Sequence, residues 1–206
     1  MYIVYIHSDY LRGVEVIDHT SFLYNGRAQS FVWRRYGFKM HLPKNALPPG
    51  ADKCLIYVKA SLSGQFHFPE SMELVSGIYW ISTPYKFAKH VTIEIQHCSS
   101  QDTSRLTYVV TKCTQEDLPY NFEILNRGVF SPSSRYGSIS LTQFSGLGII
   151  SSLLTPFRVK IYCARLYYST SGSHSWEVYF AIMWDFELHI NVRHLIIIHN
   201  PLYTVS

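Results

Sequence analysis

The stretch S-S-R-Y-G-S-I-S-L-T-Q-F-S-G-L-G, residues 133–148, decides how the rest of the chain is interpreted. Its apolar residues Ile139 and Leu141 alternate with small polar residues, and this period of two predicts a β-strand with one buried face. The alternation ends at Phe144 and Ser145, where the following glycine allows the backbone to turn sharply. Ser145 is therefore either the end of an ordinary strand or the hydroxyl nucleophile of a self-cleavage site.

Strands of the same kind are predicted along most of the chain before this stretch. Aromatic residues make up 16% of the sequence, which suits half-buried pleated surfaces. Repeated strands separated by turn residues are typical of an antiparallel β-sandwich. The fold class we expect is all-β, an antiparallel β-sandwich followed by a second, incomplete β segment. The predicted strands of the sandwich are residues 36–42, 54–62, 78–81, 90–97, 105–111, 122–125 and 136–144.

Changes in pattern divide the chain into three parts. Residues 1–32 alternate weakly and are predicted to be an N-terminal segment that is either a strand or a linker, and residues 33–150 form the sandwich. A turn-rich interval at residues 146–156 marks the next boundary. Residues 151–206 form the second β segment, a hairpin of strands 157–168 and 176–184 joined by the loop Ser169–His174. The apolar run at 195–198 resembles an unfinished strand, so we expect this segment to be truncated.

Composition argues against several classes of function. The formal net charge is +4, but the basic residues are scattered, so no nucleic-acid partner is expected. The four cysteines are widely spaced, which argues against thiolate zinc, against a disulfide framework and for a reducing, cytoplasmic location. The apolar run at 147–154 is short of the ~20 residues of a spanning helix, so membrane insertion is not expected.

Three separated segments carry a family resemblance. Residues 36–50, Y-G-F-K-M-H-L-P-K-N-A-L-P-P-G, and residues 76–98, S-G-I-Y-W-I-S-T-P-Y-K-F-A-K-H-V-T-I-E-I-Q-H-C, resemble the opening and central strands of the ZU5 domain. Residues 136–145 resemble that family's last strand, which ends in His-Phe-Ser. The chain thus resembles a divergent ZU5 domain, as in ankyrins, uncoordinated-five netrin receptors and zonula occludens proteins. Residues 151–206 are similar to the start of the UPA domain that follows ZU5 in some of these proteins.

The resemblance implies a cytoplasmic signalling adaptor or scaffold module. Such a module binds spectrin-like or death-domain-type signalling proteins, or packs against adjacent UPA and death-type domains. In this chain the two β segments would pack on each other through apolar residues that include Trp176, Phe180 and Trp184. The basic candidates for partner binding are Arg34, Arg35, Lys39 and Lys53.

Some members of the family cut themselves between the Phe and Ser of His-Phe-Ser, and the matching residues here are Gln143, Phe144 and Ser145. That reaction needs a base for the serine proton, which the histidine supplies near neutral pH. A carboxamide cannot accept the proton, and losing a general base typically costs ~10²–10⁴-fold in rate. We therefore expect the motif to be vestigial, with Phe144 in the core, and the chain to stay whole.

No other pattern indicates an active site. Neighbouring residues on a strand point to opposite faces, so His97 and Cys98 are expected to pack rather than to form a nucleophile pair. His189, His194 and His199 recur every five residues, a spacing that does not place them on one face. The sequence therefore predicts a protein that is not an enzyme and that holds no cofactor and no metal.

Overall fold

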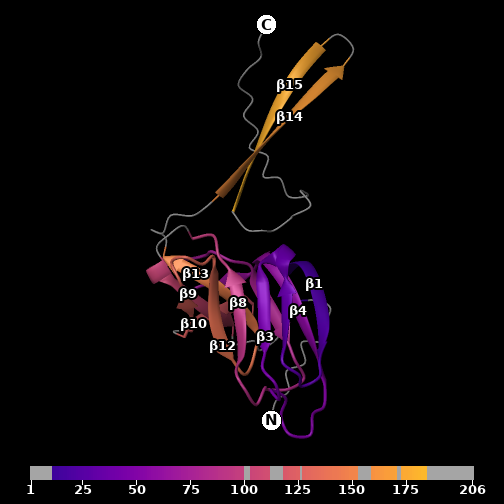
Figure 1. Ribbon diagram of the computed structural model, residues 1–206. Helices are drawn as coiled ribbons and strands as arrows, with labels where there is room; N and C mark the ends of the chain where they lie inside the picture. Colours follow the sequence, from indigo (N-terminus) through magenta and orange to yellow (C-terminus); the bar gives the residue numbers. More distant parts are fainter. Residues whose placement is uncertain are drawn as a thin grey trace.

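The computed structural model describes residues 11–99, 103–111, 118–125, 127–152, 159–170 and 173–184, the last two ranges for their backbone alone. The chain folds into two curled sheets that pack face to face, as Figure 1 shows for strands β1 to β13. Almost all neighbouring strands are antiparallel, and the exception is the short β5–β10 pair. The predicted all-β sandwich is confirmed.

The larger sheet, called sheet A here, contains eight strands. In spatial order they are β1 (Val14–Tyr24), β4 (Cys54–Gly64), β7 (Ile78–Ser82), β13 (Gly146–Ser152), β9 (Leu106–Thr111), β10 (Tyr120–Leu125) and β5 (Phe66–His67), with β6 (Met72–Leu74) paired to β13.

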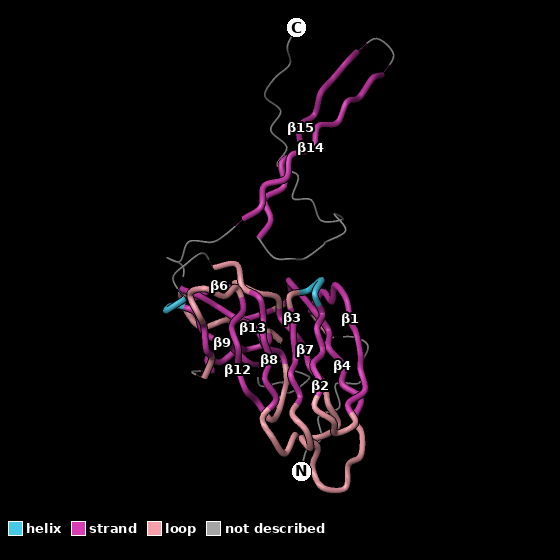
Figure 2. The backbone as a smooth tube through the Cα atoms, in the orientation of Figure 1, coloured by secondary structure: helices cyan, strands magenta, loops and turns pink. Residues whose placement is uncertain are grey.

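The smaller sheet, called sheet B here, has five strands. Their order is β11 (Val129–Phe130), β12 (Tyr136–Leu141), β8 (Val91–Gln96), β3 (Phe38–Leu42) and β2 (Gln29–Trp33). Two short 3-10 helices complete the sandwich, η1 (Arg34–Tyr36) and η2 (Thr103–Arg105). Figure 2 shows η1 at one end of the sandwich and connecting loops at the other.

The main core lies between the two sheets. Strands β3, β4 and β8 alternate buried and less buried residues, as a strand with one apolar face must. The inward-facing residues of sheet B include Phe38, Met40, Ile93, Ile95 and Ile139, all at most 2% exposed. They meet the inward face of sheet A, which supplies Ile56, Val58, Ala60, Tyr79, Ile81, Tyr108, Leu147 and Ile149.

A second apolar cluster covers the outer face of sheet A. All of Ile78–Ile81 is buried, and Ile78 and Trp80 point away from the main core because side chains alternate along a strand. Trp80 contacts the ring of Tyr120 at 4.9 Å between centroids, and its Nε1 donates to Ser61 Oγ at 3.0 Å. The other buried members are Leu11, Val109, Phe122 and Ile150. Over β7, β13, β9 and β10, sheet A is therefore apolar on both faces.

The prediction of a turn-rich interval from residue 146 is wrong for residues 146–152. They form β13, which pairs with β7 and β9 inside sheet A. Glycine at these positions serves close packing rather than a turn. A Cβ on Gly146 would lie 2.7 Å from Thr111 Cγ2 and 2.8 Å from Trp80 Cζ3, and a Cβ on Gly148 would lie 2.5 Å from Ile78 Cδ1.

Residues upstream of the expected boundary at residue 33 also belong to the sheets. Strand β1 pairs with β4, and β2 pairs with β3, so residues 14–24 and 29–32 are strands of the sandwich rather than a linker. The register of β1 shifts between Glu15 and Asp18, and such a bulge breaks the alternation that would have revealed the strand. The division into domains at residues 33 and 151 otherwise stays a prediction.

Residues 159–184 contain the predicted hairpin. Strand β14 (Val159–Thr170) pairs with β15 (Ser173–Trp184) along their whole length, up to Thr170 opposite Ser173. The expected loop Ser169–His174 is therefore too long. The side chains of Trp176, Phe180 and Trp184, and the predicted strand at 195–198, lie outside what the structure describes. Within the described residues, no helix has the length and apolar character needed to cross a membrane.

Candidate interaction surface

The outer face of sheet B carries polar residues in cross-strand rows. One row runs across all five strands in the order Val129, Ser138, Glu94, Lys39 and Val32. The neighbouring row runs Ser140, Thr92, His41 and Ser30. These nine residues, together with Tyr136, are called the sheet B face below.

A charged cluster occupies the middle of the sheet B face. Lys39 Nζ lies 2.8 Å from Glu94 Oε2, and His41 Nε2 lies 3.2 Å from Glu94 Oε1. The ammonium of Lys39 also sits 3.7 Å from the ring centroid of Tyr136. Burial alone would raise the pKa of Glu94, but the hydrogen bond from Lys39 and the charges of Lys39 and His41 outweigh it, so the pKa is lowered.

Hydroxyl groups extend this cluster to the neighbouring strands. Ser30 Oγ and His41 Nδ1 lie 2.8 Å apart, and Thr92 Oγ1 and Ser140 Oγ lie 3.2 Å apart. Side-chain contacts thus join β2 to β3, β3 to β8, and β8 to β12. Because these side chains already contact one another, they lose less rotamer freedom when a partner binds than unlinked side chains would.

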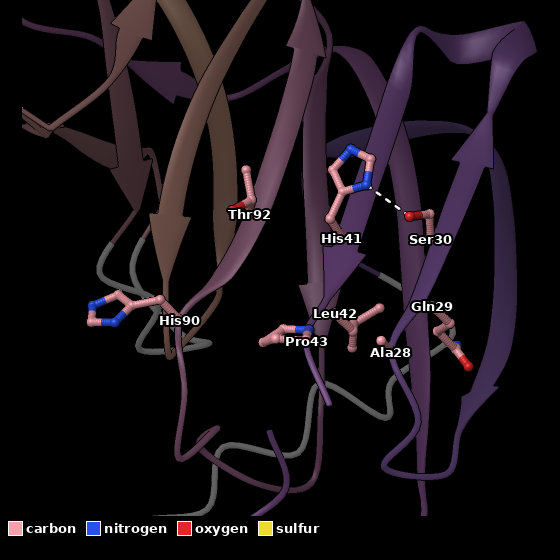
Figure 3. A pocket seen from close by; sticks show the side chains of 8 residues that line it. All are labelled: Ala28, Gln29, Ser30, His41, Leu42, Pro43, His90 and Thr92. Atoms are coloured by element: carbon pink, nitrogen blue, oxygen red, sulfur yellow. Dashed lines mark hydrogen bonds between the residues drawn. The ribbon is translucent and has the colours of Figure 1, made fainter. Parts of the chain in front are cut away.

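A shallow groove of about 450 Å³ opens beside the cluster. Figure 3 shows His41, Ser30 and Thr92 on adjacent strands at one side of it, and His90 at the other. The remaining lining residues are Ala28, Gln29, Leu42 and Pro43. The groove therefore offers hydroxyl and imidazole groups next to an apolar floor.

The side chains of Ser30, His41 and Glu94 form a series of contacts from a hydroxyl to an imidazole to a carboxylate. In a serine hydrolase the carboxylate orients the imidazole and stabilises its positive charge. Here the carboxylate of Glu94 is shared with Lys39 at 2.8 Å, so its charge is largely compensated before any proton moves. This arrangement suits the recognition of a partner better than the activation of Ser30.

The four basic candidates from the sequence do not form one patch. Arg34 and Arg35 are exposed on η1, with Arg35 Nη1 3.9 Å from Asp18 Oδ2. Lys39 is half-buried in the sheet B face, where it pairs with Glu94. Lys53 is exposed just before β4, at the opposite end of the sandwich from η1. Only Lys39 belongs to the surface described above.

The residues of the suspected cleavage motif have separate structural roles. The Phe144 ring packs edge-on against Phe87 with 5.7 Å between centroids, next to the main core. Ser145 Oγ donates to the Thr111 carbonyl oxygen at 2.7 Å, and Ile81 N–H donates to the Ser145 carbonyl oxygen at 3.2 Å. Gln143 is exposed. The hydroxyl therefore joins β13 to β9 in this structure.

His97 and Cys98 are both buried, at 2% and 0% exposure. Cys98 belongs to the main core, and the ring of His97 lies 6.2 Å from that of Phe130. These positions agree with the packing role expected from the sequence.

Sequence reasoning missed Ser30, His41 and Glu94 as site residues. His41 and Glu94 occupy polar positions in predicted alternating strands, so their exposure followed from the pattern, whereas Ser30 lies in β2, which was not predicted. What joins them is the register of β2, β3 and β8, which a single strand does not encode.

Comparison of the chain with known protein families finds no match, and comparison with curated proteins finds none either. The resemblance to the ZU5 domain accordingly rests on the three sequence segments quoted above.

Proposed function

We propose that this chain is a non-catalytic protein-interaction module of the ZU5 type that contacts its partner through the sheet B face. The observation that carries the proposal is the linked polar row with an exposed valine at each end. Val32 is 47% exposed and Val129 is 68% exposed, and they lie on the two edge strands of sheet B. Four strand spacings separate them, roughly 19 Å in all.

This arrangement fits the anatomy of protein interfaces. Apolar side chains supply buried area, while positioned charges give orientation and specificity. Lys39, Glu94 and His41 offer both signs of charge within one small area. A partner of the expected classes, a spectrin-like repeat or a death-type domain, would meet the face with complementary charges between two apolar contacts. A cytoplasmic location is part of this proposal.

The test compares variants of the two sheets. The double variant Val32→Arg/Val129→Arg places cations at both ends of the sheet B face. The control Leu23→Arg/Ile124→Arg places two cations on separate strands of sheet A, at residues that are 54% and 39% exposed. Purified spectrin repeats and death domains are titrated against each variant. We expect the first variant to weaken binding at least tenfold and the second to leave it unchanged, with equal urea midpoints. Equal binding by both variants would exclude the sheet B face as the contact surface.

The mass of the purified chain separates this proposal from self-cleavage. An interaction module gives one species of 206 residues, whereas cutting between Phe144 and Ser145 gives fragments of 144 and 62 residues. Ser145→Ala would abolish such fragments. Gln143→His restores the missing base and shows whether the backbone still permits the reaction.

A further inference from the structure

Three connecting segments lie together at the end of the sandwich opposite η1. They are residues 25–28 between β1 and β2, 43–53 between β3 and β4, and 83–90 between β7 and β8. Backbone hydrogen bonds join them, from Asn45 N–H to the Gly26 carbonyl and from Ala88 N–H to the Ala46 carbonyl, each at 2.8 Å. We call these three segments the loop end, and Figure 2 shows them as the loops farthest from η1.

The loop end is strongly basic. Its five cations are all exposed, and the three segments contain a single acidic residue, Asp52. Lys89 Nζ donates to the Lys44 carbonyl oxygen at 2.9 Å, which brings two of the cations close together. The exposed imidazole of His90 lies beside them. The five cations are Arg27, Lys44, Lys53, Lys86 and Lys89.

These cations keep their charge available for a partner. Arg35, Lys39 and His41 form ion pairs in the described part of the chain, and none of these pairs includes a cation of the loop end. In folded proteins an exposed basic cluster of this kind attracts anionic surfaces over about one Debye length, roughly 8–10 Å at physiological salt.

Apolar groups lie among the cations. Leu47, in the longest segment, packs against the main core. The tip that follows it, residues 48–51, has the uncharged sequence P-P-G-A between Lys44 and Lys53, with Pro49 and Gly50 exposed. Tyr85 is 41% exposed in the neighbouring segment. The cross-strand pair Leu23 and Leu55, 54% and 38% exposed, lies where β1 and β4 reach this end. Basic residues around exposed apolar and aromatic groups are the combination that binds the interface of anionic membranes.

We propose that the loop end binds the surface of an anionic phospholipid bilayer. The lysines and Arg27 would contact lipid phosphates and carboxylates, and the 48–51 tip would enter the headgroup region. The cations are spread over three loops rather than gathered in a pocket, so an extended flat surface meets more of them than a single anionic group does. This binding is peripheral, uses no part of the sheet B face and does not depend on the proposed protein partner.

The experiment is sedimentation of the 206-residue chain with vesicles of phosphatidylcholine, with and without phosphatidylserine. The wild-type chain is expected to sediment only with the anionic vesicles, and less as salt is added. Each basic residue near an anionic surface strengthens binding about fivefold. The triple variant Lys44→Gln/Lys53→Gln/Lys86→Gln should therefore bind about a hundredfold more weakly. None of the three side chains forms an ion pair with a described residue.

The matched control removes three exposed cations that lie outside the loop end, Arg12→Gln/Arg34→Gln/Arg127→Gln. It changes the net charge equally and should keep most of the binding. Equal loss in both triple variants would show that net charge alone acts, and would overturn the proposal. Failure of the wild-type chain to sediment with phosphatidylserine vesicles at low salt, or capture of this end by acidic polypeptide alone, would also overturn it.

A second readout tests contact by the tip itself. Pro49 is exposed at the tip, and a Pro49→Trp variant should show a blue-shifted difference emission when anionic vesicles are added. Val129→Trp places the same fluorophore on the sheet B face, where no shift is expected. A shift at Val129→Trp but not at Pro49→Trp would contradict the assignment of the loop end.

Discussion

The two sheets of this sandwich have the same kind of inner face and opposite kinds of outer face. Outside sheet A, Ile78, Trp80, Val109, Phe122 and Ile150 are each at most 5% exposed and form a second core. Outside sheet B, hydroxyl, imidazole, carboxylate and ammonium groups contact one another across the strands. Sheet A thus carries a buried apolar cluster on each side, whereas sheet B leaves a polar outer face.

The difference follows from the strand sequences. Strands β7 and β13 are apolar or small without interruption, as is typical of strands covered on both faces. Strands β3 and β8 alternate, as is typical of strands with one wet face. Substitutions on the two outer faces should therefore differ in what they change: stability for sheet A and binding for sheet B.

Among substitutions that bury no charge, the largest loss of stability is expected for Trp80→Ala. Trp80 is 2% exposed and packs against Phe66, Tyr120 and Phe122. Truncating a buried aromatic side chain leaves a cavity and typically costs about 3–5 kcal/mol. Urea unfolding followed by circular dichroism measures the change. A loss below about 1 kcal/mol would mean that the outer cluster of sheet A is not a core.

The next effect concerns the glycine that brings β13 against β7 and β9. In Gly146→Ala the new Cβ would lie 2.7 Å from Thr111 Cγ2 and 2.8 Å from Trp80 Cζ3, so these side chains must shift. Overpacking of this kind typically costs about 1–3 kcal/mol. Ser152→Ala, at the less buried end of the same strand, is the control and should change the urea midpoint little. Equal midpoints for the two variants would contradict the close packing at residue 146.

A smaller loss in the free energy of unfolding, which depends on pH, is expected for Glu94→Gln on the sheet B face. The pKa of Glu94 is lower in the folded chain than its ordinary value of 4.5, so its ionised form stabilises the fold above that pH. The contribution is lost as the pH falls through the folded pKa. Glu94→Gln should cost about 1 kcal/mol at pH 7, and the difference from wild type should shrink below about pH 4.5.

Urea midpoints measured between pH 3 and pH 7, about the range of carboxylate titration, check this dependence. Glu70→Gln changes an exposed carboxylate in a loop and serves as the control. A Glu94→Gln deficit that stays constant down to pH 3 would show that the ion pair with Lys39 does not contribute as described.

The smallest change in stability is expected at the edges of the sheet B face. Val32→Ser and Val129→Ser alter exposed side chains and should shift the free energy of unfolding by no more than about 0.5 kcal/mol. Binding to a protein partner should nevertheless weaken, which separates the two properties. A stability loss as large as that of Trp80→Ala would remove the contrast between the two outer faces.

Local pattern was enough to predict most of the sandwich. Strands β3, β4 and β8 alternate along most of their length, and their predicted ranges agree with the observed ones to within two residues at each end. Strand β13 was missed because Gly146, Gly148 and two serines resemble turn chemistry, although here glycine permits close contact with neighbouring side chains. Strand β1 was missed because its bulge interrupts the alternation.

Less of the candidate site than of the fold could be predicted from the sequence. Lys39 was singled out as a basic residue, but its pairing with Glu94 depends on the register of β3 against β8. Ser30 meets His41 for the same reason. Contacts between residues 55 positions apart, as Lys39 and Glu94 are, follow from the packing of whole strands.

One pair of variants tests the contrast between the outer faces most directly. Val109 is fully buried outside sheet A, and Thr92 is half-buried outside sheet B. Urea unfolding of Val109→Lys and Thr92→Lys compares the same new charge on the two faces. We predict that Val109→Lys fails to fold or loses most of its stability, because a buried charge has no partner there, while Thr92→Lys unfolds near the wild-type midpoint. Equal midpoints for the two variants would contradict the account.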